Sequence, residues 1–213
     1  RVLLGMNRPI ERQGGFAELV IVPDKNIYQL PKGLDMKKAP IAEPTAVSLH
    51  AVELGEESLR KSIKELKILV IGGGAIGLLC ALILEKVKGC KNVFLSEPNE
   101  KRLKSCSDNL DSISLKPNDP KLKENTFDLI FDTVGMELTR QSAIKLAKPG
   151  ASIIHIGLTQ PSGEFDFRKA TLQEVTFIGT YCYTNKDFSK TLQILSSNQL
   201  GNLNWIEFRD LKK

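Results

Sequence analysis

Apolar residues in this sequence form short unbroken runs, which are separated by longer segments with helical spacing. The run at residues 68–71 holds four consecutive aliphatic residues, three of them β-branched, and is typical of a strand buried on both faces of a parallel sheet. Similar runs predict further strands at residues 92–97, 112–115, 127–132, 151–157 and 175–179.

Helices are predicted between these strands. An apolar run follows residue 77, and helical spacing continues at residues 101–110, at residues 138–147 up to Pro149 and Gly150, and at residues 188–200. An earlier helix is predicted to begin near Pro44, because proline is favoured in the first turn. Strands that alternate with crossover helices predict the α/β class, with a doubly wound parallel sheet of the Rossmann type.

A glycine motif follows the first of these strands. Gly72, Gly74 and Gly77 have the spacing GxGxxG. The first glycine permits a tight turn, the second lets the backbone approach a pyrophosphate, and the third lets helix and strand pack closely. The motif predicts a dinucleotide site at a helix N-terminus. The alternatives are a plain glycine-rich turn and a membrane span at residues 68–84; the span is rejected because glycines interrupt it and charges flank it.

An acidic partner for the motif follows the second strand. Glu97 lies 20 residues beyond Gly77, the usual distance for a carboxylate that binds the ribose hydroxyls of NAD. Because this charge would repel a 2′-phosphate, the cofactor is predicted to be NAD rather than NADP. The alternative is a chance surface glutamate.

Two later strand ends are predicted to lie beside the cofactor. Val134 and Gly135 follow the strand at residues 127–132, and Gly157 and Leu158 follow the strand at residues 151–157. Ligands of open parallel sheets bind outside the carboxyl ends of the strands. The alternative is that both glycines serve ordinary strand-end turns.

Composition narrows the class of protein. The 30 basic and 25 acidic residues are mostly interspersed, aromatic residues make up 6%, and no basic stripe with interleaved aromatics occurs, so neither a nucleic-acid nor a membrane partner is expected. The four cysteines form no CxxC pair and predict free thiols in a reducing, cytoplasmic compartment, with Cys80 in the core. Neither His50, expected on a helix face, nor His155 has an evident partner. The chain begins with Arg1 and is expected to be part of a longer polypeptide.

The two ends of the chain differ from the middle. Short strands are predicted at residues 14–23 and 26–31, so residues 1–43 are expected to be the remnant of an incomplete β-rich catalytic domain. Residues 44–185 would form the dinucleotide-binding domain. Residues 186–213 would form a C-terminal helix and a return segment, with a strand at residues 204–208.

The motifs resemble those of the zinc-containing medium-chain alcohol and polyol dehydrogenases, in particular the sorbitol-dehydrogenase branch. The resemblance extends over nearly the whole chain. Its motifs are Gly14-Gly15-Phe16-Ala17-Glu18, Glu43-Pro44 with Leu49-His50-Ala51, the glycine motif, Glu97 with Lys101-Arg102-Leu103, Phe131-Asp132-Thr133-Val134-Gly135, and His155-Ile156-Gly157-Leu158.

The resemblance implies a role for matching positions. Ile76 would press on the nicotinamide ring, Arg102 would lie beside the adenine ribose, and Glu43 would ligate zinc or face its bound water. The full set of cofactor-binding residues that it implies is Gly72, Gly74, Ala75, Ile76, Gly77, Glu97, Arg102, Val134, Gly135, Ile156, Gly157 and Leu158.

The chain also departs from the family pattern. The family's catalytic cysteine, its Gly-His-Glu motif and its four-cysteine zinc lobe are not in this sequence, and Cys182 stands where many relatives have an arginine. No catalytic residue is therefore expected in this chain, and the chain alone is expected to be inactive.

The resemblance implies the NAD-binding portion of a zinc-dependent, homo-oligomeric dehydrogenase that transfers a hydride between a small alcohol or polyol and NAD, with zinc in the full-length enzyme. The alternatives are a non-catalytic NAD-sensing module and a methyltransferase-like nucleotide-binding domain.

Overall fold

The computed structural model describes residues 18–209. The chain divides into two compact units, residues 1–30 and residues 31–213. In the first unit, the described residues form one short 3-10 helix, η1 (Asp24–Asn26), and no strand. The predicted domain boundaries at residues 43 and 185 stay predictions.

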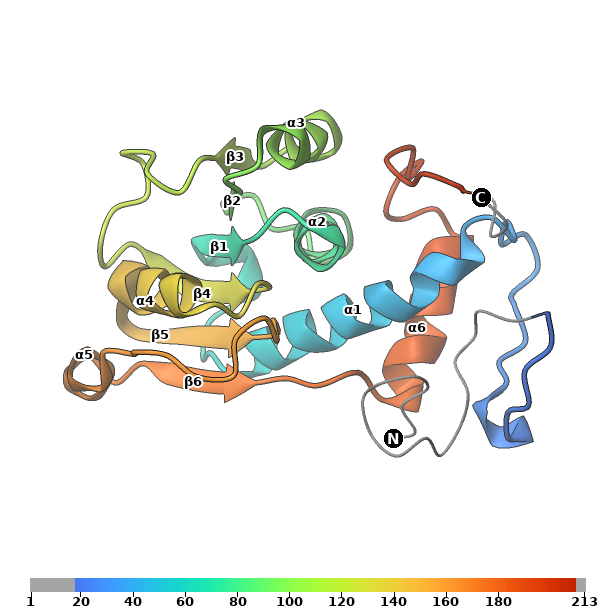
Figure 1. The fold of residues 1–213 in the computed structure, drawn as a ribbon, viewed down its shortest axis with the longest axis horizontal. Coiled ribbons are helices and arrows are strands. Elements are labelled where there is room, and N and C mark those ends of the chain that lie inside the picture. The colour runs from blue at the N-terminus through green and yellow to red at the C-terminus, as the bar shows by residue number, and fades with distance from the viewer. Residues whose placement is uncertain (1–17, 210–213) are drawn as a thin grey trace. The chain divides into compact units, whose positions relative to one another are not determined.

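The second unit is built on a parallel sheet with the strand order β3-β2-β1-β4-β5-β6 (Figure 1). Every pair of neighbouring strands is parallel. The strands are β1 (Ile68–Ile71), β2 (Val93–Ser96), β3 (Ile113–Leu115), β4 (Phe127–Asp132), β5 (Ala147–His155) and β6 (Thr176–Gly179). The α/β class and the doubly wound parallel sheet predicted from the sequence are confirmed.

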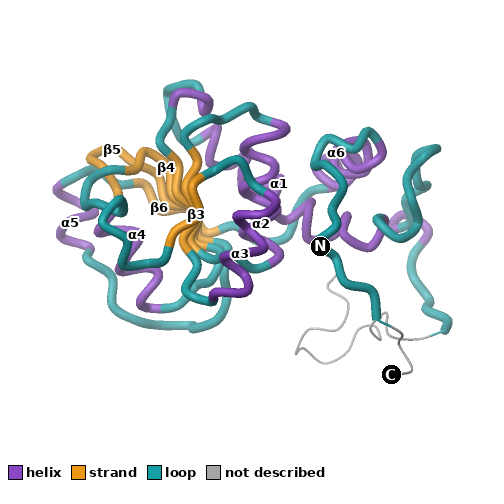
Figure 2. Tube along the Cα trace, turned by 90° about the horizontal axis from the view of Figure 1, so that it is seen from above, coloured by secondary structure: helices purple, strands orange, loops and turns teal. Residues whose placement is uncertain are grey.

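Helices cover both faces of this sheet. Figure 2 shows α1, α2 and α3 on one side and α4 and α5 on the other. The helices are α1 (Ala42–Glu57), α2 (Ala75–Leu82), α3 (Glu100–Asn109), α4 (Glu137–Leu146), α5 (Phe167–Leu172) and α6 (Asn185–Ser196), with short helices η2 (Ala39–Ile41), η3 (Ile63–Glu65) and the π-helical turn η4 (Ile83–Val87). In the part of the chain that is described, no helix is both long and apolar enough to cross a membrane.

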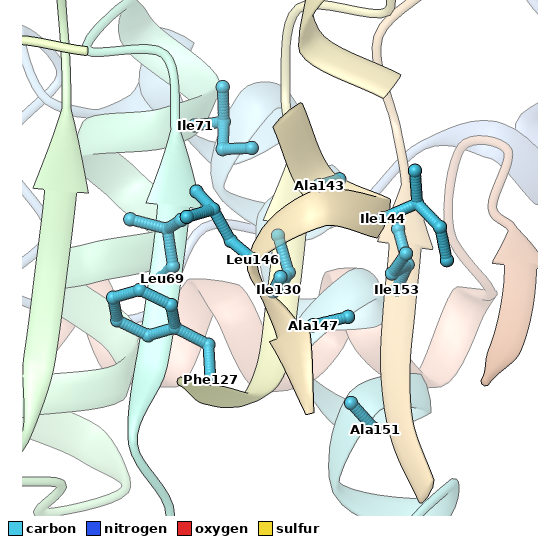
Figure 3. Close-up of a cluster of buried hydrophobic side chains, with 10 residues drawn as sticks. All are labelled: Leu69, Ile71, Phe127, Ile130, Ala143, Ile144, Leu146, Ala147, Ala151 and Ile153. Atoms are coloured by element: carbon cyan, nitrogen blue, oxygen red, sulfur yellow. The ribbon is translucent and has the colours of Figure 1, made fainter. Parts of the chain in front are cut away.

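The core lies against both faces of the sheet, because side chains alternate along each strand. Figure 3 shows the cluster between the sheet and α4, which consists of Leu69, Ile71, Phe127, Ile130, Ala143, Ile144, Leu146, Ala147, Ala151 and Ile153. On the other face, a Cβ added at Gly55 of α1 would lie 2.9 Å from the Phe131 ring and 3.2 Å from Leu129. Helix α1 therefore packs closely on the central strands.

Three predicted strands are absent from the described residues. Residues 18–31 contain no strand, and residues 14–17 lie outside the described range. Residues 204–208 contain a turn instead, in which the Ile206 N–H donates to the Leu203 carbonyl at 3.1 Å. The physical reason is the same in each case. A strand exists only when a neighbouring strand pairs with it, and no described segment pairs with these.

The helix predicted at residues 138–147 also has a different end. It ends at Leu146, and β5 begins directly at Ala147, so Pro149 and Gly150 lie inside the strand and not in a separate turn. The pairing of β4 with β5 is irregular there, between Phe127 and Leu129. A prolyl residue lacks an N–H for the ladder, and such an irregularity accommodates it.

Helix α6 packs against α1 through polar contacts that join the two (Figure 1). The Nδ1 atom of His50 lies 2.9 Å from Asp187 Oδ2, and Lys190 pairs with Glu53. Asp187 also caps its own helix, because it accepts hydrogen bonds from the Thr184 N–H and hydroxyl, both at 2.7 Å. The expectation that His50 has no partner is therefore wrong, since a partner 137 positions away is invisible in the local sequence.

The buried Asp187 carboxylate predicts a pH-dependent stability. Burial alone would raise its pKa, but the Thr184 hydrogen bonds and His50 outweigh burial and lower the pKa below the ordinary 3.8. A lowered pKa contributes stability above the ordinary value, and this contribution is lost as the pH falls through the folded-state value. We expect Asp187→Asn to reduce the free energy of unfolding by about 1–2 kcal/mol at neutral pH, as measured by denaturant unfolding.

The control is Asp108→Asn, which removes an exposed intrahelical pair with Lys104 and should cost less than about 0.5 kcal/mol. The difference between Asp187→Asn and the original protein should shrink at a pH below the lowered pKa. A difference that stays constant with pH would contradict this account of Asp187.

Candidate functional site

The predicted cofactor residues converge on the carboxyl edge of the sheet. The strand order reverses between β1 and β4, and an open α/β sheet binds its ligands at such a reversal. The loops after these two strands are in direct contact, since the Thr133 N–H and hydroxyl both donate to the Ile71 carbonyl, at 3.0 and 2.8 Å. The loops after β2 and β5 flank them.

The glycine loop has the geometry of a phosphate cradle. Gly72 has a φ of +101°, which favours glycine, and a Cβ on Gly77 would lie 1.8 Å from the Gly72 carbonyl oxygen. Both residues are thus required by the close approach of α2 to β1. Gly74 is the N-cap residue of α2, and a Cβ added there would meet nothing within 4 Å. The exposed N-terminus of α2 at Gly74 and Ala75 therefore has room for a phosphate.

The loop depends on one glycine that the motif leaves unspecified. A Cβ on Gly73 would lie 2.9 Å from Cys106 Sγ and 3.0 Å from Glu97 Cβ. Cys106 is fully buried on α3, beneath the loop, and its thiol lies 3.7 Å from the Gly73 carbonyl oxygen. The signal for this close packing in the sequence is the run of three consecutive glycines, of which Gly73 is the middle one. The residues that pack against Gly73 could not be read from the sequence.

Glu97 follows β2 and is held by the glycine loop itself. Its side chain accepts hydrogen bonds from the Gly73 N–H at 2.7 Å and from the Asn99 N–H at 2.8 Å. The residue is only 3% exposed, so the alternative of a chance surface glutamate is wrong. A carboxylate offers about four lone-pair sites, and the hydrogen bonds from Gly73 and Asn99 use two of them. Arg102 is exposed in the first turns of α3, where its N–H donates to the N-cap Asn99.

The loops after β4 and β5 pack backbone against backbone. A Cβ on Gly135 would lie 2.1 Å from the Gly157 carbonyl oxygen, and a Cβ on Gly157 would lie 2.0 Å from the Val134 carbonyl carbon. Both glycines are needed for this contact, whether or not a ligand is bound. The geometry therefore supports the alternative that both glycines have a structural role in the turns at the strand ends.

Asp132 organises these loops, and sequence reasoning gave it no separate role. It is fully buried at the end of β4, and its Oδ1 atom accepts from the Val134 and Gly135 N–H groups at 3.1 and 2.9 Å. Its Oδ2 atom accepts from the Thr139 hydroxyl at 3.0 Å. The signal for this role in the sequence was an acidic residue at the end of a predicted strand, shortly before a glycine.

His155 lies beside Asp132 on β5, with 3.7 Å between its Nε2 atom and Asp132 Oδ2. The β4–β5 register places these two residues side by side, but 3.7 Å is too long for a hydrogen bond, and His155 Nε2 has no hydrogen-bond partner among the described residues. The expected lack of a partner therefore holds for hydrogen bonding, while Asp132 acts on His155 through its charge. Burial lowers the pKa of His155, Asp132 raises it, and Arg140 lowers it, with a net decrease. The imidazole is consequently neutral at physiological pH.

Apolar side chains border the same edge. Leu158 is 69% exposed after β5, Ile76 is half-buried at the start of α2, Val134 is half-buried after β4, and Ile156 is buried. Exposed aliphatic groups beside a phosphate cradle could contact a planar ring. The structure therefore brings together all twelve predicted cofactor-binding positions along the ends of four strands.

Glu43 lies apart from this group in sequence, in the first turn of α1. Its side chain is exposed to solvent, and partial desolvation raises the pKa of its carboxyl group. Among the described residues, no group of three or more His, Cys, Asp or Glu side chains could hold a metal ion.

The four cysteines are free thiols, as predicted, and Cys80, Cys90 and Cys106 are buried. Burial raises the pKa of Cys80 to about 12 and those of Cys90 and Cys106 to about 11. These three thiols are therefore protonated at neutral pH and have no nucleophilic role. Cys182 is half-buried after β6 and has a φ of 55°.

Comparison with known proteins identifies relatives over most of the chain. A probable diacetyl reductase of Saccharomyces cerevisiae is 27% identical over 202 residues, which are 89% of this chain and 47% of that protein. Galactitol 1-phosphate 5-dehydrogenase of Escherichia coli is 29% identical over 184 residues, 80% of this chain and 51% of that protein. The chain thus spans about half the length of these relatives.

Solved structures share the fold. An Escherichia coli alcohol dehydrogenase in complex with NADH aligns with a TM-score of 0.78 at 24% identity, over 89% of this chain and 56% of that one. A putative zinc-binding dehydrogenase from Sinorhizobium meliloti bound to NADP aligns with a TM-score of 0.76 at 23% identity, over 89% and 57%.

The sequence model of one family, described as zinc-binding dehydrogenase, matches residues 75–197. This match begins at the N-terminus of α2, in the glycine loop, and continues through α6. It therefore includes the start of α2 and the loops after β2, β4 and β5, but not Gly72 and Gly74. The chain belongs to the zinc-binding dehydrogenase family.

Proposed function

We propose that this chain is the NAD-binding portion of a zinc-dependent dehydrogenase, which transfers a hydride between a small alcohol or polyol and NAD. The observation that carries the proposal is the glycine cradle at the start of α2, which has open space at Gly74 and backbone contact at Gly77. The family assignment supports the reaction class and disfavours a methyltransferase-like domain.

The residues of this chain would bind and orient the cofactor. The N–H groups at the start of α2 would bind the pyrophosphate, aided by the helix dipole. The free lone pairs of Glu97 would accept the ribose hydroxyls, with Arg102 beside them. Val134, Ile156 and Leu158 would contact the nicotinamide half opposite Ile76. When bound, NAD would supply the hydride acceptor, and zinc would supply a Lewis acid for the substrate oxygen.

Glu43 is the one residue of this chain that we propose as a zinc ligand or as a hydrogen-bond acceptor for zinc-bound water. The remaining ligands would come from outside the described residues. The alternative is a helix-start carboxylate that interacts with the α1 dipole.

A homo-oligomer is proposed from the outer edge of the sheet. Strand β6 is largely exposed, carries no charged residue, and presents Phe177 at 44% exposure. Exposed, uncharged edge strands readily pair with a strand of another chain. The free thiols support the proposed cytoplasmic location. Among the described residues, no helix is long and apolar enough to cross a membrane, and the interspersed charges of the sequence do not favour a nucleic-acid partner.

The proposed activity is tested with the full-length protein, by measuring zinc content and reduction of NAD in the presence of small alcohols and polyols. We expect zinc-dependent turnover by the full-length protein and none by the 213-residue chain, because this chain lacks the family's zinc-ligand motifs. NAD binding without turnover in the zinc-loaded full-length protein would favour the non-catalytic sensing module. Turnover by the 213-residue chain would show that the catalytic groups have been misplaced.

A matched pair of glycine substitutions tests the cradle. Gly74 has a φ of −72° and free space, so Gly74→Ala should leave the melting temperature nearly unchanged and weaken NAD binding about tenfold or more, because the methyl group occupies the phosphate approach. Gly77→Ala should lower the melting temperature as well, since its Cβ would collide with the Gly72 carbonyl. Calorimetry measures both quantities, and unchanged NAD affinity in Gly74→Ala would contradict the site.

Cofactor preference tests Glu97. We expect NAD to bind more tightly than NADP by about tenfold or more, because a carboxylate beside a 2′-phosphate is a like-charge contact that costs several kcal/mol. Titration calorimetry with both cofactors measures the ratio. Equal affinities would show that Arg102 neutralises the phosphate or that Glu97 does not bind the ribose.

Glu43→Gln in the full-length protein tests the metal role. The substitution keeps the size of the side chain and removes its charge. If Glu43 serves the metal, zinc content or turnover should fall about 10–100-fold, while NAD affinity and melting temperature stay constant. Glu57→Gln at the other end of α1 is the matched control. A loss of stability with full activity would assign Glu43 to the helix start alone.

A further inference from the structure

Helix α4 carries a buried arginine next to the candidate site. Arg140 on α4 is 9% exposed, and no carboxylate forms an ion pair with it in the described part of the chain. Burying an unpaired guanidinium is costly unless every donor finds an acceptor. The hydrogen bonds of the Arg140 guanidinium explain how its charge is accommodated at this buried position.

The guanidinium binds main-chain carbonyls of two separate loops. Nη1 donates to the Gly135 carbonyl at 3.0 Å and to the Gln160 carbonyl at 3.1 Å, and Nη2 donates to the Ser162 carbonyl. Gly135 belongs to the loop after β4, whereas Gln160 and Ser162 belong to the segment after β5. Only arginine presents a rigid fork of donors that reaches several acceptors at once.

Further contacts join the same two loops. The Gln160 N–H donates to the Gly135 carbonyl at 2.9 Å, and the Thr159 hydroxyl donates to the Val134 carbonyl at 2.7 Å. On the other side of Gln160, its Oε1 atom accepts from the Glu137 N–H at 2.7 Å. Together with the Gly135–Gly157 contact, these bonds make the two loops one unit, with Leu158 exposed at its edge.

We infer that Arg140 is a positioning residue for the nicotinamide half of the cofactor: by clamping the loop after β4 to the loop after β5, it fixes Val134 and Leu158 where the ring would lie. This inference rests on the proposed function, because the ring contacts belong to that proposal. Arg140 itself touches no ligand. The adenosine half is held by other elements, the glycine loop and Glu97, which Arg140 does not contact.

This division of contacts makes the inference testable with two ligands. ADP-ribose has every group of NADH except the nicotinamide ring. In the full-length protein, Arg140→Met should weaken NADH binding about tenfold, because the two loops beside the ring would no longer be joined, and change ADP-ribose binding less than about twofold. The fluorescence of the bound nicotinamide should also move toward that of free NADH. Arg168→Met, which removes an exposed cation from α5, should change neither ligand.

A second substitution covers the case in which Arg140→Met does not fold. Thr159→Val removes one hydrogen bond of the bridge at an exposed position and should produce the same selective effect with a smaller amplitude. Equal losses for both ligands, or unchanged NADH affinity and fluorescence in both variants, would overturn the positioning role. If the unmodified protein binds ADP-ribose but the fluorescence of bound NADH shows no contact with the nicotinamide, the positioning role of Arg140 is wrong and the proposed cofactor site is not contradicted. If it binds neither ligand, the proposed function fails together with the clamp.

Discussion

The candidate site depends on the close approach of backbone to backbone at the carboxyl edge of the sheet. At two places a Cβ would lie about as close as a covalent neighbour: Gly77 against the Gly72 carbonyl, and Gly135 against Gly157. The first contact brings the N-terminus of α2 to the end of β1, where it can present its N–H groups. The second brings the loops after β4 and β5 together. Without side chains at these positions, four strand ends form one continuous surface.

Two buried carboxylates then hold the loops in place. Glu97 accepts from the Gly73 N–H, and Asp132 accepts from the Val134 and Gly135 N–H groups. Each acid satisfies loop donors that a regular element would have paired, so burial of the charge is compensated. The bonds that stabilise the loop also fix the orientation of Glu97, which we propose as the residue that binds the ribose. Structure and proposed binding are here served by one side chain.

Several polar pairs act over long sequence separations. His50 reaches Asp187 between α1 and α6, and Arg140 reaches the carbonyls of Gln160 and Ser162. These pairs lie outside the ribose and phosphate contacts, and they fix how helices and loops meet the sheet. In this chain, polar and charged side chains therefore join elements that lie far apart in the sequence.

Much of the fold was predictable from the sequence, because it follows from local patterns. Short segments rich in apolar residues identified all six strands of the sheet, and the GxGxxG spacing with Glu97 indicated the position of the candidate site. Short helix α5 was missed, since its exposed apolar residues, Phe167 and Leu172, lack a helical stripe. The strands expected at residues 26–31 and 204–208 are absent, because pairing requires a partner that local sequence cannot supply.

The sequence by itself thus determined the order of elements, the glycine loop and the acid beside it, since backbone conformation and burial depend on residues near in the chain. Only the tertiary structure decided which residues meet: Cys106 beneath Gly73, His155 beside Asp132, and Arg140 between two loops. Such contacts depend on strand order and register. These are set when the whole sheet assembles, and no short stretch of sequence contains them.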